Sequence, residues 1–292
     1  MDDFEPKEID EKAEEAWEAR MRGPGIPAPP ELPPTAEEKQ AQGDELIHEG
    51  RLTKAIKAYR DAVNLDRDNA AYRVRLGDAY AYGESATKAI AEYRKVLKMN
   101  PRRAEPHFSL AEIYRRHGKM QAAINSYRKA VQYNPMNPFY RYKLGHALGQ
   151  TGSFDEAVEQ MEAAVHMTVT DGFYHFCLGD LYALLDRVTD AIIEMQQATI
   201  FAPYDAYYNL RLGMLYLRAG YHEDAVDALE HAVKLNPDDA AYHCVLADAF
   251  LKVGDRNNAF EHYKYAQQLD PYDADHLDRI RRFTENHDKP RG

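Results

Sequence analysis

Hydrophobic and polar positions along the chain follow the periodicity of amphipathic helices. Residues 206–239 carry two apolar stripes, formed by Tyr208, Leu212 and Leu215 and then by Leu229 and Ala232. Spacings of three and four residues place each stripe on one face of a helix. Gly220 separates the stripes and is typical of a residue that ends a helix. The segment therefore predicts two helices joined by a short turn.

This helix pair recurs every 34 residues. Small residues mark the period at Gly43, Gly77, Ala111, Gly145, Gly179, Gly213 and Ala247. Seven units follow without insertion or deletion, and together they cover 36-273 (36-69, 70-103, 104-137, 138-171, 172-205, 206-239 and 240-273). One pair of helices cannot bury both apolar stripes alone. The repetition therefore predicts a solenoid in which neighbouring units cover one another.

The units resemble the tetratricopeptide repeat. That motif has Leu-Gly at positions seven and eight, an aromatic residue at eleven, Ala at twenty and twenty-seven, and Pro at thirty-two. The sixth unit matches with Leu212, Gly213, Tyr216, Ala225, Ala232 and Pro237. The resemblance implies an all-α fold, a right-handed superhelical solenoid of helix-turn-helix repeats whose first helices line a concave groove.

The units also depart from the motif. The usual Trp at position four is absent, and Arg67 and Val169 stand where the closing Pro is expected. The β-branched run 168–170 has poor helix propensity. It predicts a looser or bent junction between the fourth and fifth units.

The ends of the chain differ from the repeats. Leu277, Ile280 and Phe283 lie on one face of 274-284, which predicts a C-terminal capping helix, and 285-292 form a C-terminal tail. Residues 1-22 form an acidic segment in which apolar residues recur every fourth position, as on an amphipathic helix. The proline-rich stretch 23-35 predicts a semi-rigid linker.

Composition adds few constraints. Two cysteines among 292 residues exclude a disulfide scaffold. The chain starts without a basic or apolar run, and no stretch of 18 residues lacks a charge, so we expect a cytoplasmic protein with no membrane insertion. Most of the 21 tyrosines fall on the repeating grid and are expected to be core residues.

Charge is distributed unevenly. The net charge is -11, yet the second and third units hold thirteen basic and five acidic residues, whereas the later four units hold nine and 21. Three interpretations of the basic units remain open: a solvated face, a docking site for an acidic segment, and nucleic-acid binding. The last is disfavoured because no aromatic residues are interleaved in an RNA-reading motif.

Catalytic and metal-binding patterns are missing from the sequence. There is no glycine-rich phosphate loop, zinc-protease motif or nucleophile elbow, so we expect no enzyme, no cofactor and no metal. His107, His175 and His243 share position four of their units and are interpreted as a packing position. Cys177 and Cys244 lie on first helices and are interpreted as buried or groove-lining thiols.

The resemblance also indicates which residues would line the groove. These are Phe108, Phe139, Tyr142, His146, Phe173, Phe176, Tyr207 and Leu210, with flanking charges at Arg75, Arg115, Arg116, Lys143 and Arg211. If seven large apolar side chains stayed half exposed, the patch would reach about 500 Å², a size typical of interaction sites. The alternative is that these aromatics only pack between adjacent first helices.

We therefore expect a scaffold or adaptor that binds an apolar or aromatic segment of a partner protein in the groove and assists complex assembly. Two alternatives are a permanent structural subunit that uses convex or edge surfaces, and RNA binding through the second and third units. The N-terminal segment offers Phe4, Ile9, Trp17 and Met21 as anchors. It could gate its own groove, join copies into a homo-oligomer, bind an outside partner, or serve only as a solubilising tail.

Overall fold

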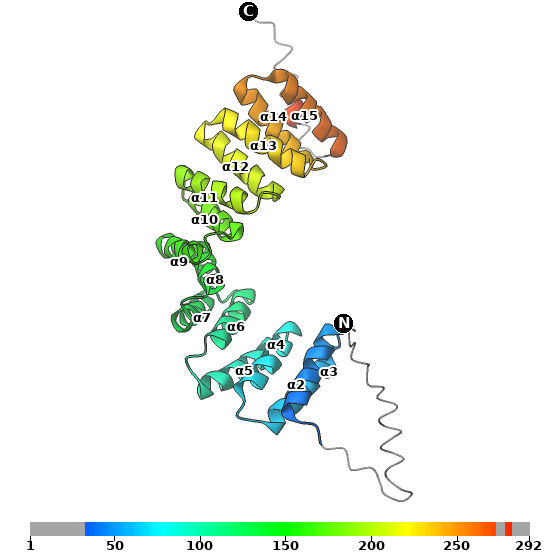
Figure 1. The fold of residues 1–292 in the computed structure, drawn as a ribbon, viewed down its shortest axis with the longest axis vertical. Coiled ribbons are helices and arrows are strands. Elements are labelled where there is room, and N and C mark those ends of the chain that lie inside the picture. The colour runs from blue at the N-terminus through cyan, green and yellow to red at the C-terminus, as the bar shows by residue number, and fades with distance from the viewer. Residues whose placement is uncertain (1–32, 273–277, 282–292) are drawn as a thin grey trace, which may run out of the picture. The chain divides into compact units, whose positions relative to one another are not determined.

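The computed structural model describes residues 33–272 and 278–281, and all regular secondary structure within these ranges is helical (Figure 1). The first helices of the seven repeats are α2 (Ala36–His48), α4 (Ala70–Tyr82), α6 (Ala104–Arg116), α8 (Pro138–Gln150), α10 (Gly172–Leu184), α12 (Ala206–Ala219) and α14 (Ala240–Val253). The second helices are α3 (Leu52–Leu65), α5 (Ala86–Met99), α7 (Met120–Tyr133), α9 (Phe154–Met167), α11 (Val188–Phe201), α13 (His222–Leu235) and α15 (Arg256–Leu269). The predicted all-α fold of helix-turn-helix repeats is confirmed.

Several predicted segments lie outside the described residues. These are the acidic segment with Phe4, Ile9, Trp17 and Met21, most of the linker, and the tail at 285-292. Of the predicted capping helix, residues 278–281 are described and helical. Ile280 packs against the core of the last two repeats, and the Arg279 guanidinium donates a hydrogen bond to Asp248.

The chain divides into two units, residues 1–67 and 68–292. In the first unit, Thr35 begins α2 with a capping box, because its hydroxyl accepts from the Glu38 N–H while the Glu38 carboxylate accepts from the Thr35 N–H. A Cβ at Gly43 would lie 2.5 Å from the Tyr59 ring, so a larger residue there would require that ring to shift.

The second unit holds α4 to α15. One core cluster joins the third to sixth repeats and another joins the sixth and seventh, and both are built from the predicted apolar stripes. The alanines at position twenty are fully buried from Ala89 to Ala259. Small residues at this position let the two helices of a repeat pack closely.

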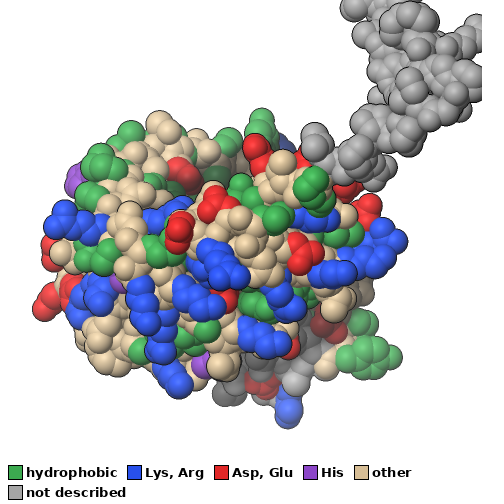
Figure 2. Space-filling model, turned by 90° about the horizontal axis from the view of Figure 1, so that it is seen from below, with side chains coloured by type: hydrophobic (Ala, Val, Ile, Leu, Met, Phe, Trp, Pro, Cys, Tyr) green, Lys and Arg blue, Asp and Glu red, His purple; other side chains and the backbone are tan. Residues whose placement is uncertain are grey.

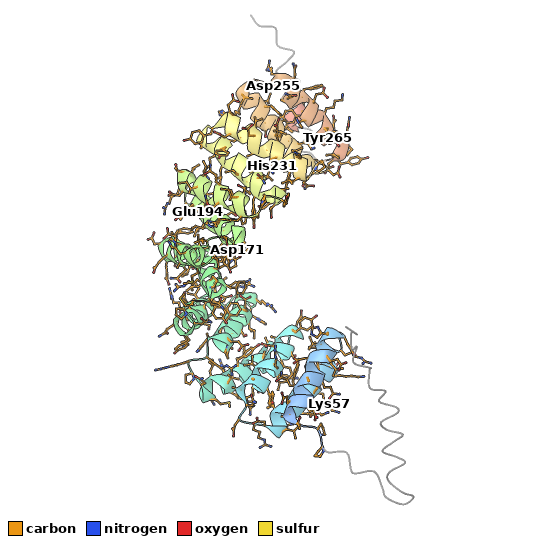
Figure 3. The ribbon with its side chains drawn as sticks, viewed as in Figure 1. Lys57, Asp171, Glu194, His231, Asp255 and Tyr265 are labelled. Atoms are coloured by element: carbon orange, nitrogen blue, oxygen red, sulfur yellow. The ribbon has the colours of Figure 1, made fainter. Side chains whose placement is uncertain are left out.

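The junctions between repeats reuse one histidine contact. The Nε2 atom of His107 lies 3.0 Å from the Pro101 carbonyl, and that of His243 lies 2.9 Å from the Pro237 carbonyl. His175 makes the same contact with the Val169 carbonyl at 3.1 Å. Its Nδ1 also lies 2.7 Å from Glu194, labelled on α11 in Figure 3. The missing proline therefore leaves this junction contact intact.

Candidate protein-binding surface

Aromatic side chains connect successive first helices in the middle of the second unit. Phe108 on α6 stacks on Tyr140 and contacts Phe139, both on α8, with ring centroids 4.6 and 5.6 Å apart. Tyr142 contacts Phe173 on α10 at 5.0 Å, and Phe176 contacts Tyr207 and stacks on Tyr208. In each case the residue at position five packs against positions two and three of the next repeat.

The residues at position two remain open to solvent. Phe139, Phe173 and Tyr207 keep 42%, 39% and 45% of their surface exposed, and we call these three rings the aromatic row. At about 40% exposure they offer roughly 200–300 Å² of aromatic surface, less than the sequence-based expectation. Leu210 is 8% exposed and belongs to the core, so it does not contribute to this surface.

Basic groups border the aromatic row. The Lys143 Nζ lies 5.2 Å from the Phe139 ring centroid and 3.7 Å from Glu112 Oε1. Arg211 donates to the Tyr207 hydroxyl at 3.2 Å and pairs with Asp180 at 2.5 Å. These contacts hold both cations next to the rings, where a ligand would meet mixed aromatic and charged chemistry.

The other flanking bases differ in their surroundings. Arg115 pairs with Glu112 at 3.0 Å. Arg116 lines a cavity of about 500 Å³ between the second and third repeats, together with Asp78, Glu84, Phe108 and Glu112. Arg75 is exposed on α4. The face in Figure 2 shows Lys and Arg side chains spread among acidic and apolar ones.

A tyrosine at position twenty-four bonds the two helices of some repeats. The Tyr93 hydroxyl donates to Asp78 at 2.6 Å, and the hydroxyls of Tyr127 and Tyr263 donate to Glu112 and Asp248. Each carboxylate stands at position nine of the first helix. The fourth, fifth and sixth repeats have Met161, Met195 and Leu229 at position twenty-four instead. This interhelical bond is therefore not formed in the middle of the second unit.

A central cavity of about 500 Å³ opens where this bond is missing. It is lined by Gly145, His146, Gly149, Gln150, Met161, Cys177, Asp180, Leu181, Ala183, Leu184, Arg211 and Arg218. Gly149 is not required by packing, because a Cβ there would meet its nearest atoms at 3.8 and 4.0 Å. A larger residue would fit the helix but would take space from the cavity.

The protonation of the cavity groups follows from burial. Burial, with the charges of Lys143 and Arg115, lowers the pKa of His146, which is therefore neutral at pH 7. Burial and the nearby charge of Asp180 raise the pKa of the Cys177 thiol to about 12. Burial raises the pKa of Asp180, and Arg211 opposes that shift. The cavity thus presents a neutral imidazole, a thiol and a paired carboxylate.

Sequence reasoning named His146, Lys143 and Arg211 but missed the cavity around them. Gly149, Met161 and Leu184 were not predicted because each repeat was compared with the family motif at one position at a time. A signal existed in the alignment of the seven units. Position twenty-four changes from Tyr to Met in the fourth unit, which also has Gly149 at position twelve.

Paired helices in a fixed 34-residue register define a class of helical-repeat proteins whose units stack on their neighbours. The chain belongs to the tetratricopeptide repeat family. A family model described as TPR repeat matches residues 43–83 and 111–152, and two described as tetratricopeptide repeat match 142–206 with 210–274, and 70–103. Such repeats typically mediate protein–protein interactions and are generally non-catalytic.

Solved structures share this fold. The C-terminal part of a TPR repeat-containing protein from Cytophaga hutchinsonii has a TM-score of 0.69 and 17% identity, covering 82% of this chain and 98% of that chain. PilF of Pseudomonas aeruginosa has a TM-score of 0.58 and 17% identity, covering 74% of this chain and 97% of that chain. YrrB, described as a TPR protein with an unusual peptide-binding site, has a TM-score of 0.56 and 19% identity, covering 64% of this chain and 96% of that chain. No curated protein matches the chain.

In 33–272 and 278–281, no group of three or more His, Cys, Asp or Glu side chains could hold a metal ion. Across the same residues, no helix is both long and apolar enough to cross a membrane.

Proposed function

We propose that the protein is a scaffold that binds an apolar or aromatic segment of a partner protein along its first helices, and so assists complex assembly. The aromatic row supports this proposal most directly. Its three rings recur at one position of three consecutive repeats and keep about two fifths of their surface exposed. Fully packed interhelical aromatics would not leave this surface.

The rings have a supporting layer beneath them. Phe108, Tyr142 and Phe176 are partly buried against the core and contact the next ring of the row. Rigid aromatic side chains lose little conformational entropy when a ligand binds, which favours affinity. The neighbouring Lys143 and Arg211 add polar contacts at the edge. The surface therefore suits a segment with large apolar side chains and flanking charges.

A random peptide library displayed on phage tests the proposal with the full-length chain. The wild-type protein is expected to enrich peptides rich in aromatic and large aliphatic residues. A variant with Phe139→Ser, Phe173→Ser and Tyr207→Ser should lose this enrichment, since it removes the exposed rings and leaves the buried layer in place. Equal enrichment by the variant would contradict the proposal.

A second candidate function is that of a permanent structural subunit. The observation in its favour is the outer side of α11, where Ile193 and Ile200 are 50% and 62% exposed and lie two helical turns apart. A variant with Ile193→Ser and Ile200→Ser serves as the matched control above. If it disrupts a native assembly while the aromatic-row variant leaves that assembly intact, the structural role is favoured.

A further inference from the structure

The central cavity lies beside the aromatic row and continues its surface. Arg211 lines the cavity and donates to the hydroxyl of Tyr207, a ring of the row, at 3.2 Å. His146 lines it from α8, and its ring centroid lies 6.1 Å from that of Tyr142, which belongs to the layer beneath the row. A segment bound along the aromatic row therefore runs next to the cavity, and one of its side chains can enter it.

The charged groups of the cavity already have partners. Arg211 pairs with Asp180 at 2.5 Å. Arg218 pairs with Asp186 at 2.7 Å and donates to the Ala183 carbonyl at 2.8 Å. The imidazole and the thiol of the lining are both neutral at pH 7. A charged ligand group would lose its hydration without meeting an unpaired counter-ion, so the cavity favours an uncharged group.

The apolar walls of the cavity favour an aromatic ring. Met161 and Leu181 are buried, and Leu184 is 68% exposed at the last residue of α10, so apolar surface runs from inside the cavity to its rim. A volume of about 500 Å³ leaves an aliphatic side chain with many unfilled contacts. A thioether such as that of Met161 also makes favourable contacts with aromatic rings.

Two polar side chains of the lining are accessible to a ligand. His146 and Gln150 are exposed, and neither makes a hydrogen bond to another residue in the part of the chain that the structure describes. A ligand that covers them removes their water, which costs free energy unless the ligand offers hydrogen bonds in return. A neutral imidazole and an amide each donate and accept, and a phenol hydroxyl also does both. The aromatic ring that suits this pair best is therefore that of tyrosine.

We propose that the central cavity is an anchor pocket for a tyrosine side chain of the partner segment. The ring lies against Met161 and Leu181, and the hydroxyl bonds to the polar pair His146 and Gln150. The inference rests on the proposed function, because it names the side chain by which the bound segment is held. It also gives that function a specificity, since phenylalanine and charged residues at the anchor position bind more weakly than tyrosine.

N-acetyl-tyrosinamide tests the pocket without any partner. In an NMR titration of the full-length protein, we expect binding at about 1 mM and a shift of the His146 ring signals, which the His146→Gln variant assigns. N-acetyl-phenylalaninamide should bind about three- to tenfold more weakly, because it lacks the hydroxyl. N-acetyl-lysinamide should not bind. Equal binding of the tyrosine and phenylalanine probes, or unchanged His146 signals, overturns the proposal.

Two cavity variants test where the tyrosine probe binds. Gly149→Leu fills the cavity from α8 and should abolish detectable binding. His146→Leu changes an exposed side chain and should remove the preference for tyrosine over phenylalanine, even if the first variant fails to fold. Gln132→Leu, at an exposed position of α7, is the matched control and should change neither result. A tyrosine preference that survives in His146→Leu contradicts the proposal.

Peptides from the phage library separate this inference from the function beneath it. We expect the enriched peptides to contain a tyrosine, and its replacement by phenylalanine should weaken binding to the wild type but not to His146→Leu. If peptides bind through the aromatic row while the tyrosine probe stays out of the cavity, the scaffold function stands and the anchor fails. If the probe binds but no peptide is enriched, the scaffold function fails, and the role of the pocket in holding a partner fails with it.

Discussion

The third and fifth repeats share one sequence pattern but connect their helices differently. In the third, the Tyr127 hydroxyl donates to Glu112, so position nine is tied to the second helix of the same repeat. In the fifth, Met195 replaces the tyrosine, and Asp180 at position nine pairs with Arg211 of the next repeat at 2.5 Å. Both carboxylates contact a base of the next repeat, since Glu112 lies 3.7 Å from the Lys143 Nζ, but only Glu112 is also bonded to the second helix of its own repeat.

This difference changes which groups face the two cavities, since the cavity between the second and third repeats is lined by Tyr93 and the central one by Met161. A tyrosine at position twenty-four extends from the core to the first helix, where its hydroxyl donates a hydrogen bond to the carboxylate at position nine. A thioether fills the core without reaching a polar partner, and Met195 is fully buried. Position nine then becomes available to a neighbour or a ligand. A solenoid can thus vary its binding surface by changing a core residue while keeping the repeat register.

The largest effect that distinguishes the two regions should come from the tyrosine hydroxyl. Tyr127→Phe removes a buried hydrogen bond to an ionised carboxylate, and we expect a loss of about 1.5–3 kcal/mol in stability. Met195→Leu conserves volume in the fifth repeat and should cost less than about 1.5 kcal/mol. Urea unfolding with hydrogen exchange in α7 and α11 measures both. Equal losses of stability in the two variants would show that position twenty-four contributes through side-chain size alone and not through the tyrosine hydrogen bond.

The sequence predicted the repeat and its helices because small residues and apolar stripes recur at fixed intervals. Gly213 is one such residue, since a Cβ there would lie 2.5 Å from Leu229. The sequence also predicted aromatic residues at the positions of the aromatic row, but the exposed aromatic area was overestimated. Phe108, Tyr142 and Phe176 are partly buried against the core, so they add little to it. The burial of Leu210 depends on packing against the seventh repeat and was not visible in its own unit.

A smaller, pH-dependent effect separates two repeats that both have the tyrosine bond. Burial raises the pKa of Asp78, and the Tyr93 hydroxyl only partly offsets it. Burial also acts to raise the pKa of Glu112, but hydrogen bonds from Tyr127 and Arg115 and the charge of Lys143 outweigh it, so that pKa is lowered. Two carboxylates at the same repeat position therefore contribute to stability with opposite signs.

The sign follows from linkage between protonation and folding. The Glu112 contribution is fully present above the usual carboxyl pKa and is lost as the pH falls through the lowered folded value. The contribution of Asp78 to folding stability is greatest below the usual carboxyl pKa and is lost as the pH rises through the raised pKa of the folded state. Glu112→Gln should therefore cost about 1 kcal/mol at pH 7. Asp78→Asn should stabilise the protein at that pH, and unfolding titrations from acid to neutral pH check both.

The smallest expected effect concerns the glycine that opens the cavity, and its sign is positive. Gly149→Ala places a Cβ in ordinary contact, at 3.8 Å from Leu181, and exchanges a poor helix former for the best one. We expect a gain of about 0.4–1 kcal/mol in unfolding free energy. Gly145→Ala, one helical turn earlier, is the matched change that should destabilise, since its Cβ would lie 2.9 Å from Met161 and 3.0 Å from the Ala157 carbonyl. Thermal unfolding of the two variants compares them directly. A loss of stability in Gly149→Ala would mean that the glycine serves packing, whereas a gain would leave room for the cavity as the reason for its presence.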